Sequence, residues 1–149
     1  MREILFRGKR LDNGEWVEGF YVRADLHWHE KGIHNDWIVC SACANGGWLA
    51  LCKRHPVDPS TVGQYTGLTA NGKKIFEGDI VKYKNTDGIK FNGVALTVIG
   101  KVVYNEKNAS FAISGKDEIG AKHYDYFTVK NIEVIGNKWD NPELLEDEG

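Results

Sequence analysis

The sequence lacks a long hydrophobic run, a cysteine framework and a large excess of either charge. Its longest uncharged stretch, 37–52, is too short to cross a bilayer and is interrupted by Asn45, Gly46 and Gly47. The 149 residues include 3 cysteines, an odd number that favours reduced thiols over a set of disulfides. A net charge of −2 provides no overall basic field for nucleic acid or an anionic membrane.

The first ten residues, MREILFRGKR, lack the apolar core and the cleavage site of a secretory signal. We therefore expect a soluble cytoplasmic protein that has no membrane segment and no membrane partner. A chain of this length suits one domain with a core large enough to need no disulfide.

The sequence also lacks the apolar spacing of amphipathic helices, i, i+3, i+4 and i+7. Its 5 Trp, 6 Tyr and 6 Phe occur with β-branched residues in short runs, which Asn-Gly, Asp-Gly or Gly-Gly pairs separate. Such runs are typical of strands joined by tight turns. The sequence therefore predicts a mostly β protein, a β-rich α+β fold at most.

Turn residues divide these runs into two hairpins and a series of strands. Asn13-Gly14 and Asn45-Gly46-Gly47 are each flanked by strand-like runs and predict hairpin turns. Asp58 or Ser60 is expected to cap a short helical turn, and Pro142 to begin another in the tail. Later strands are predicted at 73–83, 94–104, 110–115, 123–129 and 132–139, with a mobile loop or hairpin tip at 82–93.

We expect a single domain over 1–149 with sub-lobes. These are an N-terminal β lobe at about 1–57, a turn-rich connector at 58–76, and an SH3-like small barrel at 77–149 with its tail. Closure into a barrel would remove exposed strand edges.

The stretch from Gly67 to Lys74 reads G-x-x-x-x-G-K-K, one residue away from a phosphate-binding P-loop. A P-loop follows a buried strand and opens into a helix, whose N–H groups hold the phosphates. Here the preceding residues are not apolar, the following ones are strand-like, and Lys74 replaces the hydroxyl residue. The stretch therefore predicts a turn at Asn71-Gly72, and Asp79 is expected to accept backbone N–H bonds.

Three cysteines and a histidine have spacings that suit tetrahedral zinc. Cys40, Cys43, Cys52 and His55 form C-x2-C-x8-C-x2-H, with His27, His29 and His34 nearby. Regular strands would turn residues three apart to opposite faces, which favours core cysteines instead. With a three-residue hairpin loop, Cys40 and Cys52 would lie opposite each other as apolar neighbours or a redox-sensitive pair. No metal ligand is assigned, and a zinc-stabilised module stays an alternative.

No hydrolase signature and no nucleophile paired with a base is recognisable. We therefore assign no catalytic or cofactor-binding residue, and expect a non-enzymatic protein without a cofactor. A nucleic-acid-binding barrel is an alternative. Its basic and aromatic side chains would come from Lys82, Tyr83, Lys84, Lys90, Phe91 and Lys101.

Three stretches together resemble one family: FRGKRLDNGEWVEGFYV, DPSTVGQYTGLTANGKKIFEGDIVKY and EVIGNKWDNPELL. They are similar to the YopX-like proteins of phages and prophages of Gram-positive bacteria. The resemblance implies a phage or prophage origin, a β-rich protein in the host bacterial cytosol, and self-association. It provides no catalytic or binding residues. Our expectation is an interaction module with a protein partner, either a second copy as a homo-oligomer or a host factor.

Overall fold

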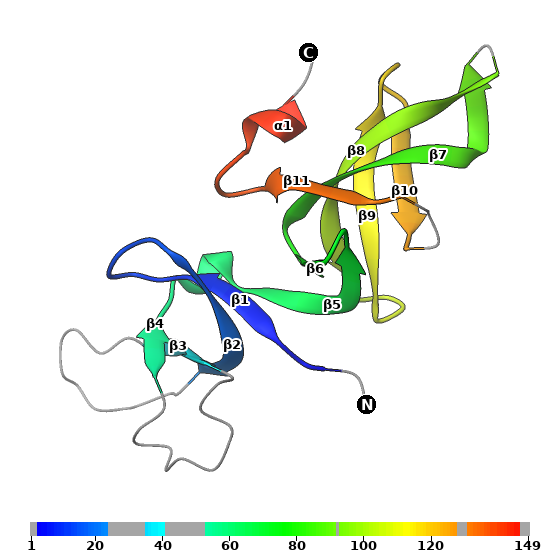
Figure 1. Ribbon diagram of the computed structural model, residues 1–149. Helices are drawn as coiled ribbons and strands as arrows, with labels where there is room; N and C mark the ends of the chain where they lie inside the picture. The colour runs from blue at the N-terminus through cyan, green and yellow to red at the C-terminus, as the bar shows by residue number, and fades with distance from the viewer. Residues whose placement is uncertain (1–2, 24–34, 41–52, 92, 128–130, 147–149) are drawn as a thin grey trace. The chain divides into compact units, whose positions relative to one another are not determined.

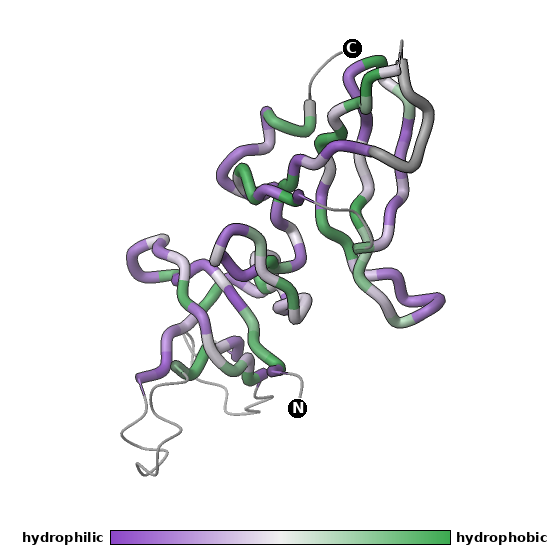
Figure 2. Tube along the Cα trace, turned by 45° about the vertical axis from the view of Figure 1, so that its right-hand side comes forward, coloured by the Kyte–Doolittle hydropathy of each residue, from purple (hydrophilic) through white to green (hydrophobic). Residues whose placement is uncertain are grey.

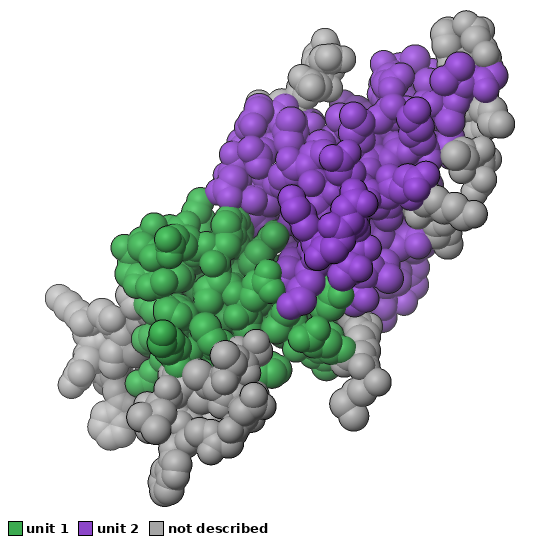
Figure 3. Space-filling model, viewed as in Figure 1, with its two compact units in different colours: residues 1–65 green, residues 66–149 purple. Residues whose placement is uncertain are grey.

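A computed structural model describes residues 3–23, 35–40, 53–91, 93–127 and 131–146 (Figure 1), with the backbone alone at 86–91 and 146. The chain divides into unit 1, Met1–Tyr65, and unit 2, Thr66–Gly149, which Figure 3 shows in two colours. Strands dominate both units, so the predicted mostly β fold is confirmed. None of the helices in the described ranges is both long and apolar enough to span a membrane.

The first sheet has the strand order β4-β3-β2-β1-β5-β6. Its strands are β1 (Phe6–Lys9), β2 (Trp16–Arg23), β3 (Asp36–Cys40), β4 (Arg54–Pro56), β5 (Gly63–Ala70) and β6 (Lys73–Phe76). β5 begins in unit 1, where Gly63 and Gln64 pair with β1, and it continues into unit 2. The segment 58–76, expected to be a turn-rich connector, thus contains two strands.

Local turn chemistry shapes unit 1 as predicted. The β1–β2 hairpin turns at Gly14, which has a φ of 73°, and Asn13 accepts the backbone N–H of Glu15. Asp58 caps the 3₁₀ turn Pro59–Thr61 by accepting the backbone N–H of Ser60 at 2.9 Å.

The core of unit 1 includes Ile38 of β3. Leu5, Ile38, Val57 and Tyr65 are buried there. Tyr21 donates its hydroxyl to the buried Asp36, and burial, followed by this hydrogen bond, raises the pKa of Tyr21 to about 12. The phenol therefore stays protonated and anchors β2 to β3.

Asn71 and Gly72 form the tight turn between β5 and β6, with φ values of 50° and 77°. Two successive positive φ angles are typical of a type I′ hairpin turn. Lys73 and Lys74 begin strand β6 rather than a helix. The prediction of a turn in place of a P-loop is confirmed.

The second sheet lies in unit 2 and has the order β10-β9-β8-β7-β11. Its elements are β7 (Asp79–Phe91), β8 (Val94–Asn105), β9 (Ser110–Asp117), β10 (Lys122–Tyr126) and β11 (Glu133–Asn137), followed by helix α1 (Glu143–Glu146). All its pairings are antiparallel. Among the described residues no pairing joins β10 to β11, so the sheet is open rather than a closed barrel. The SH3-like detail stays a prediction.

Segment 82–93, expected to be a loop or hairpin tip, is mostly strand. β7 runs through Phe91 and pairs with β8, with an irregularity between Asn85 and Lys90. The tip falls near Gly93, whose φ is 79°. Of the two predicted alternatives, the structure supports the hairpin, since strand pairing of β7 with β8 includes 82–85 and 90–91.

The core of unit 2 packs the end of β5 and β6 against the sheet. Its buried members are Ala70, Ile75, Val81, Tyr83, Val98, Val102 and Ile113. Each aliphatic side chain of Val or Ile size contributes roughly 1.5–3 kcal/mol by leaving water. We call the side of β7–β10 that bears Val81, Val98 and Ile113 the inner face, and the opposite side the outer face.

The turn from β6 into β7 links this core to the end of the chain. Asp79 accepts the backbone N–H of Phe76 at 2.8 Å, as expected from the sequence. Gly78, at a φ of 84°, donates its N–H to the carbonyl of Val102 and lies under the ring of Trp139. A Cβ at Gly78 would lie 2.4 Å from that ring, so only glycine fits.

Candidate functional site

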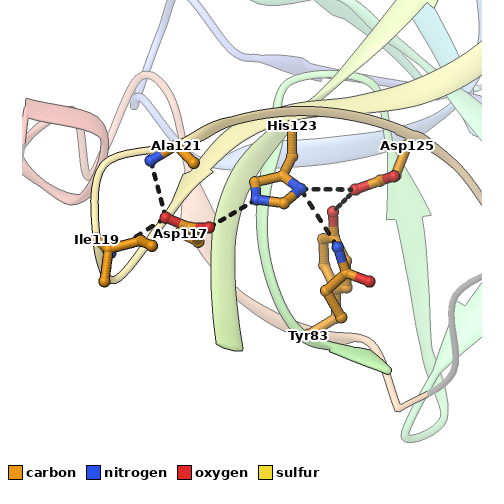
Figure 4. A network of polar contacts seen from close by, with 7 residues as sticks. Tyr83, Asp117, Ile119, Ala121, His123 and Asp125 are labelled. Carbon is orange, nitrogen blue, oxygen red and sulfur yellow. Dashed lines mark hydrogen bonds and ion pairs between the residues drawn. The ribbon is translucent and has the colours of Figure 1, made fainter. Parts of the chain in front are cut away.

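A line of polar contacts crosses the inner face of unit 2. Tyr83 on β7 donates its hydroxyl to Asp125 on β10. Nδ1 of His123 lies 3.7 Å from a carboxylate oxygen of Asp125 and 3.3 Å from Nδ2 of Asn85. Nε2 of His123 lies 2.9 Å from Oδ2 of Asp117. Figure 4 shows that the contacts form one connected network, which ties β7 to β9 and β10.

Asn85 determines which ring nitrogen of His123 carries the proton in the neutral state. Because the amide nitrogen of Asn85 only donates, Nδ1 of His123 accepts, and Nε2 therefore donates to Asp117. Asp117 also accepts the backbone N–H groups of Ile119 at 3.1 Å and Ala121 at 2.8 Å. These bonds, the one from His123 first, hold the pKa of Asp117 below its usual 3.8.

The network holds strands together rather than activating a nucleophile. Burial, followed by the hydrogen bond to Asp125, raises the pKa of Tyr83 well above its usual 10.0, so the phenol stays protonated at neutral pH. No serine, threonine or cysteine side chain is among the described members of this network. The carboxylates of Asp117 and Asp125 accept bonds from groups of the same network.

We predict that the stability of unit 2 falls in acid partly through Asp117. Since the folded pKa of Asp117 is lowered, its contribution is fully present above about pH 4 and is lost as the pH falls through the folded value. Asp117→Asn should lower stability at pH 7 and flatten the decline below pH 4, as measured by urea unfolding across pH. Wild type and variant declining in parallel would contradict this role.

The alternation of side chains separates the charges of unit 2 by sign. On β7–β10, every described lysine side chain lies on the outer face: Lys82, Lys84, Lys101, Lys116 and Lys122. The described carboxylates of the same strands, Asp79, Asp117 and Asp125, lie on the inner side. In Figure 2, hydrophilic and hydrophobic residues follow one another along the strands themselves and are not confined to separate strands and turns. On these four strands the outer face is therefore basic although the whole chain is not, and on β11 Glu133 lies opposite Lys82.

Three of these lysines lie in one row across the sheet, which we call the lysine row. Lys82 pairs with Ile99, Ile99 with Lys116, and Lys116 with Lys122. Lys116 and Lys122 are thus directly opposite, at about 5 Å between their Cβ atoms. Within the described ranges, none of the five outer-face lysines forms an ion pair or hydrogen bond through its side chain.

Directly opposed like charges cost roughly 0.2–1 kcal/mol. Protection of an exposed sheet edge accounts for Lys122 on the edge strand β10, but not for Lys116 and Lys82, which lie on the interior strands β9 and β7. An anion bound over the row would offset the repulsion.

A hollow of about 630 Å³ lies over this part of unit 2. Its basic and hydroxyl-bearing lining includes Thr97, Lys101, Ser114, Lys116 and Lys122. Leu144 and Leu145 of α1 also line it, and α1 contacts β8. Asp117, Glu118 and His123 are further lining residues. The hollow thus offers ammonium and hydroxyl donors beside an apolar wall.

The basic face predicted from sequence is only partly right. Lys82 and Lys84 are exposed and Lys101 is half-buried on the outer face. Tyr83 is 1% exposed and points to the inner face, because neighbouring residues of a strand alternate. The side chains of Lys90 and Phe91 lie outside the described residues.

The structure describes half of the proposed zinc set. Cys40 ends β3, and His55 on β4 pairs with Ile38. Cys43 and Cys52 lie outside the described residues, as do His27, His29 and His34. The N–H of Cys40 bonds to the carbonyl of Lys53, so Lys53 rather than Cys52 lies across from Cys40, and that part of the prediction is wrong. In the portion of the chain that the structure describes, no three candidate ligands are grouped to hold a metal ion.

Sequence reasoning missed the polar network and two of the five outer-face lysines, Lys116 and Lys122. His123 and Asp125 are two residues apart in a predicted strand, and this spacing already places both on one face. Lys122 and Tyr124 show the same spacing on the other face. No such spacing in the sequence relates Asp117 to His123, because their proximity depends on the turn between β9 and β10.

A family model described as YopX protein matches residues 5–146, a span that includes most of both units. No curated protein matches the chain.

Proposed function

The chain belongs to the YopX protein family, and from this premise we propose that it is a non-enzymatic binding module whose outer face in unit 2 binds nucleic acid. The observation that carries the proposal is the lysine row, in which Lys82, Lys116 and Lys122 align across four strands. None of the three forms an ion pair among the described residues, although Glu133 on β11 lies across from Lys82. Lysines that neutralise phosphates release condensed counterions, which supplies affinity without base recognition.

The protein partner expected from sequence ranks second. A protein-binding face is typically depleted of lysine at its centre, whereas the outer face has lysine there. A phage or prophage setting, a cytosolic location and self-association stay predictions. The non-enzymatic part is supported by the inner network, in which the phenol of Tyr83 is buried and protonated. Among its described members, Asp125 accepts from Tyr83, and Asp117 accepts from His123 and two backbone N–H groups.

We predict that Lys116→Gln/Lys122→Gln lowers the affinity for a short fluorescent oligonucleotide about tenfold at low salt, since two phosphate contacts are lost. Fluorescence anisotropy measures the affinity. The matched control is Lys73→Gln/Lys107→Gln, which has the same net charge and changes exposed lysines outside the outer face.

Unfolding does not account for the expected loss. Removing the opposed charges at Lys116 and Lys122 should leave stability unchanged or raise it by about 0.2–1 kcal/mol. Equal affinities of the two double variants would overturn the assignment of the outer face, and no binding by the wild type would overturn the proposed function itself.

A further inference from the structure

Two exposed tyrosines lie next to the lysine row. Tyr124 and Tyr126 follow Lys122 on the outer face of β10, and 47% and 45% of their respective surfaces are exposed. Their ring centroids are 6.1 Å apart with the ring planes at 90°. Asn108 donates a hydrogen bond to the hydroxyl of Tyr126 at 2.9 Å, which anchors that ring. Tyr124 is left as the ring next to Lys122.

Small side chains occupy the neighbouring positions on β9. Tyr124 pairs with Ser114 and Tyr126 with Ala112. Ser114 also lines the hollow and pairs with Lys101 on its other side. The space over β9 beside Tyr124 is therefore bounded by a lysine and a hydroxyl, with no bulky side chain directly across from the ring.

The spacing along β10 suits one nucleotide. Lys122 and Tyr124 are two residues apart, roughly 7 Å along a strand. A lysine that contacts a phosphate would thus have an aromatic ring within reach of the attached base. Base faces are covered by their neighbours inside a duplex, whereas bases of a single strand are free to stack on an aromatic side chain.

We propose that the ligand of the outer face is single-stranded nucleic acid, with its phosphates along the lysine row and a base stacked on Tyr124. This inference rests on the proposed function and adds the form of nucleic acid and the residue that selects it. Stacking on tyrosine tolerates any base, so the expected preference is for strandedness rather than for sequence.

The test compares oligothymidylate and oligouridylate of about 12 nucleotides, within the range that small barrels cover, with a duplex of equal length. We expect each single strand to bind about tenfold more tightly than the duplex. Tyr124→Ala should lower single-strand affinity about tenfold and leave duplex affinity unchanged, while Tyr124→Phe keeps the wild-type value. The two oligonucleotides distinguish DNA from RNA as the preferred ligand.

Tyr104→Ala is the control, because Tyr104 is also exposed but lies on the other side of β8, where its ring packs on Phe111. Equal binding of duplex and single strand, or an unchanged affinity in Tyr124→Ala, overturns the stacking proposal and leaves the proposed function standing. Failure of every nucleic acid to bind overturns both.

Discussion

Gly115→Ala is expected to destabilise unit 2 by about 3 kcal/mol or more, the largest effect of any single methyl group that we predict. Gly115 on β9 pairs directly with Gly100 on β8. A Cβ on Gly115 would lie 2.1 Å from the carbonyl oxygen of Ile99 and 2.5 Å from the Cα of Gly100. Both are backbone atoms, so no side-chain rotation relieves the clash and the two strands must separate.

Urea unfolding followed by far-UV circular dichroism measures this loss. Gly120→Ala is the control: Gly120 has a positive φ of 81°, which Gly115 does not, and no atom lies within 4 Å of the added Cβ. Its expected cost is the backbone strain alone, about 1–2 kcal/mol. If Gly115→Ala unfolds at the same urea concentration as the control, β8 and β9 do not approach as closely as described.

Asp125→Ala is expected to destabilise unit 2 by about 2–3 kcal/mol, more than Tyr83→Phe at about 1 kcal/mol. The first change leaves the hydroxyl of Tyr83 buried without its acceptor. The second leaves the carboxylate of Asp125, whose side chain is 30% exposed and regains water. Asp125→Ala is expected to lose more stability than Tyr83→Phe because it leaves a buried polar group without a hydrogen-bond partner.

The double variant Tyr83→Phe/Asp125→Ala separates the hydrogen bond from other effects. Removing both partners leaves no unsatisfied group, so the double variant should lose less stability than the two single variants combined. Urea unfolding of the three variants gives the coupling energy. Simple additivity would mean that the contact contributes nothing to stability.

Local turn chemistry was the part of the fold that the sequence predicted best. The turns at Asn13-Gly14 and Asn71-Gly72 and the cap at Asp58 depend on residues that are neighbours in the chain. Each is an interaction between a side chain and a backbone at most a few residues away, and it needs no knowledge of the rest of the molecule.

The candidate site depends instead on long-range register. Lys82, Lys116 and Lys122 form a row only because three hairpins set four strands in one alignment. The register between β7 and β8 shifts between Asn85 and Lys90. No pattern in the sequence predicts the position of this shift, and the shift determines which residues face each other. The alternation of side chains along a strand is, however, visible in the sequence. It already places Tyr83 on the face opposite to Lys82 and Lys84.

The salt dependence of oligothymidylate binding tests the central claim most directly. For a single strand, each lysine that neutralises a phosphate adds about 0.7 to the slope of log affinity against log salt concentration. The account predicts that Lys116→Gln/Lys122→Gln lowers the magnitude of this slope by about 1.4, and that Lys73→Gln/Lys107→Gln leaves it at the wild-type value. A slope that is the same in all three proteins would contradict the assignment of the lysine row as the phosphate-binding surface.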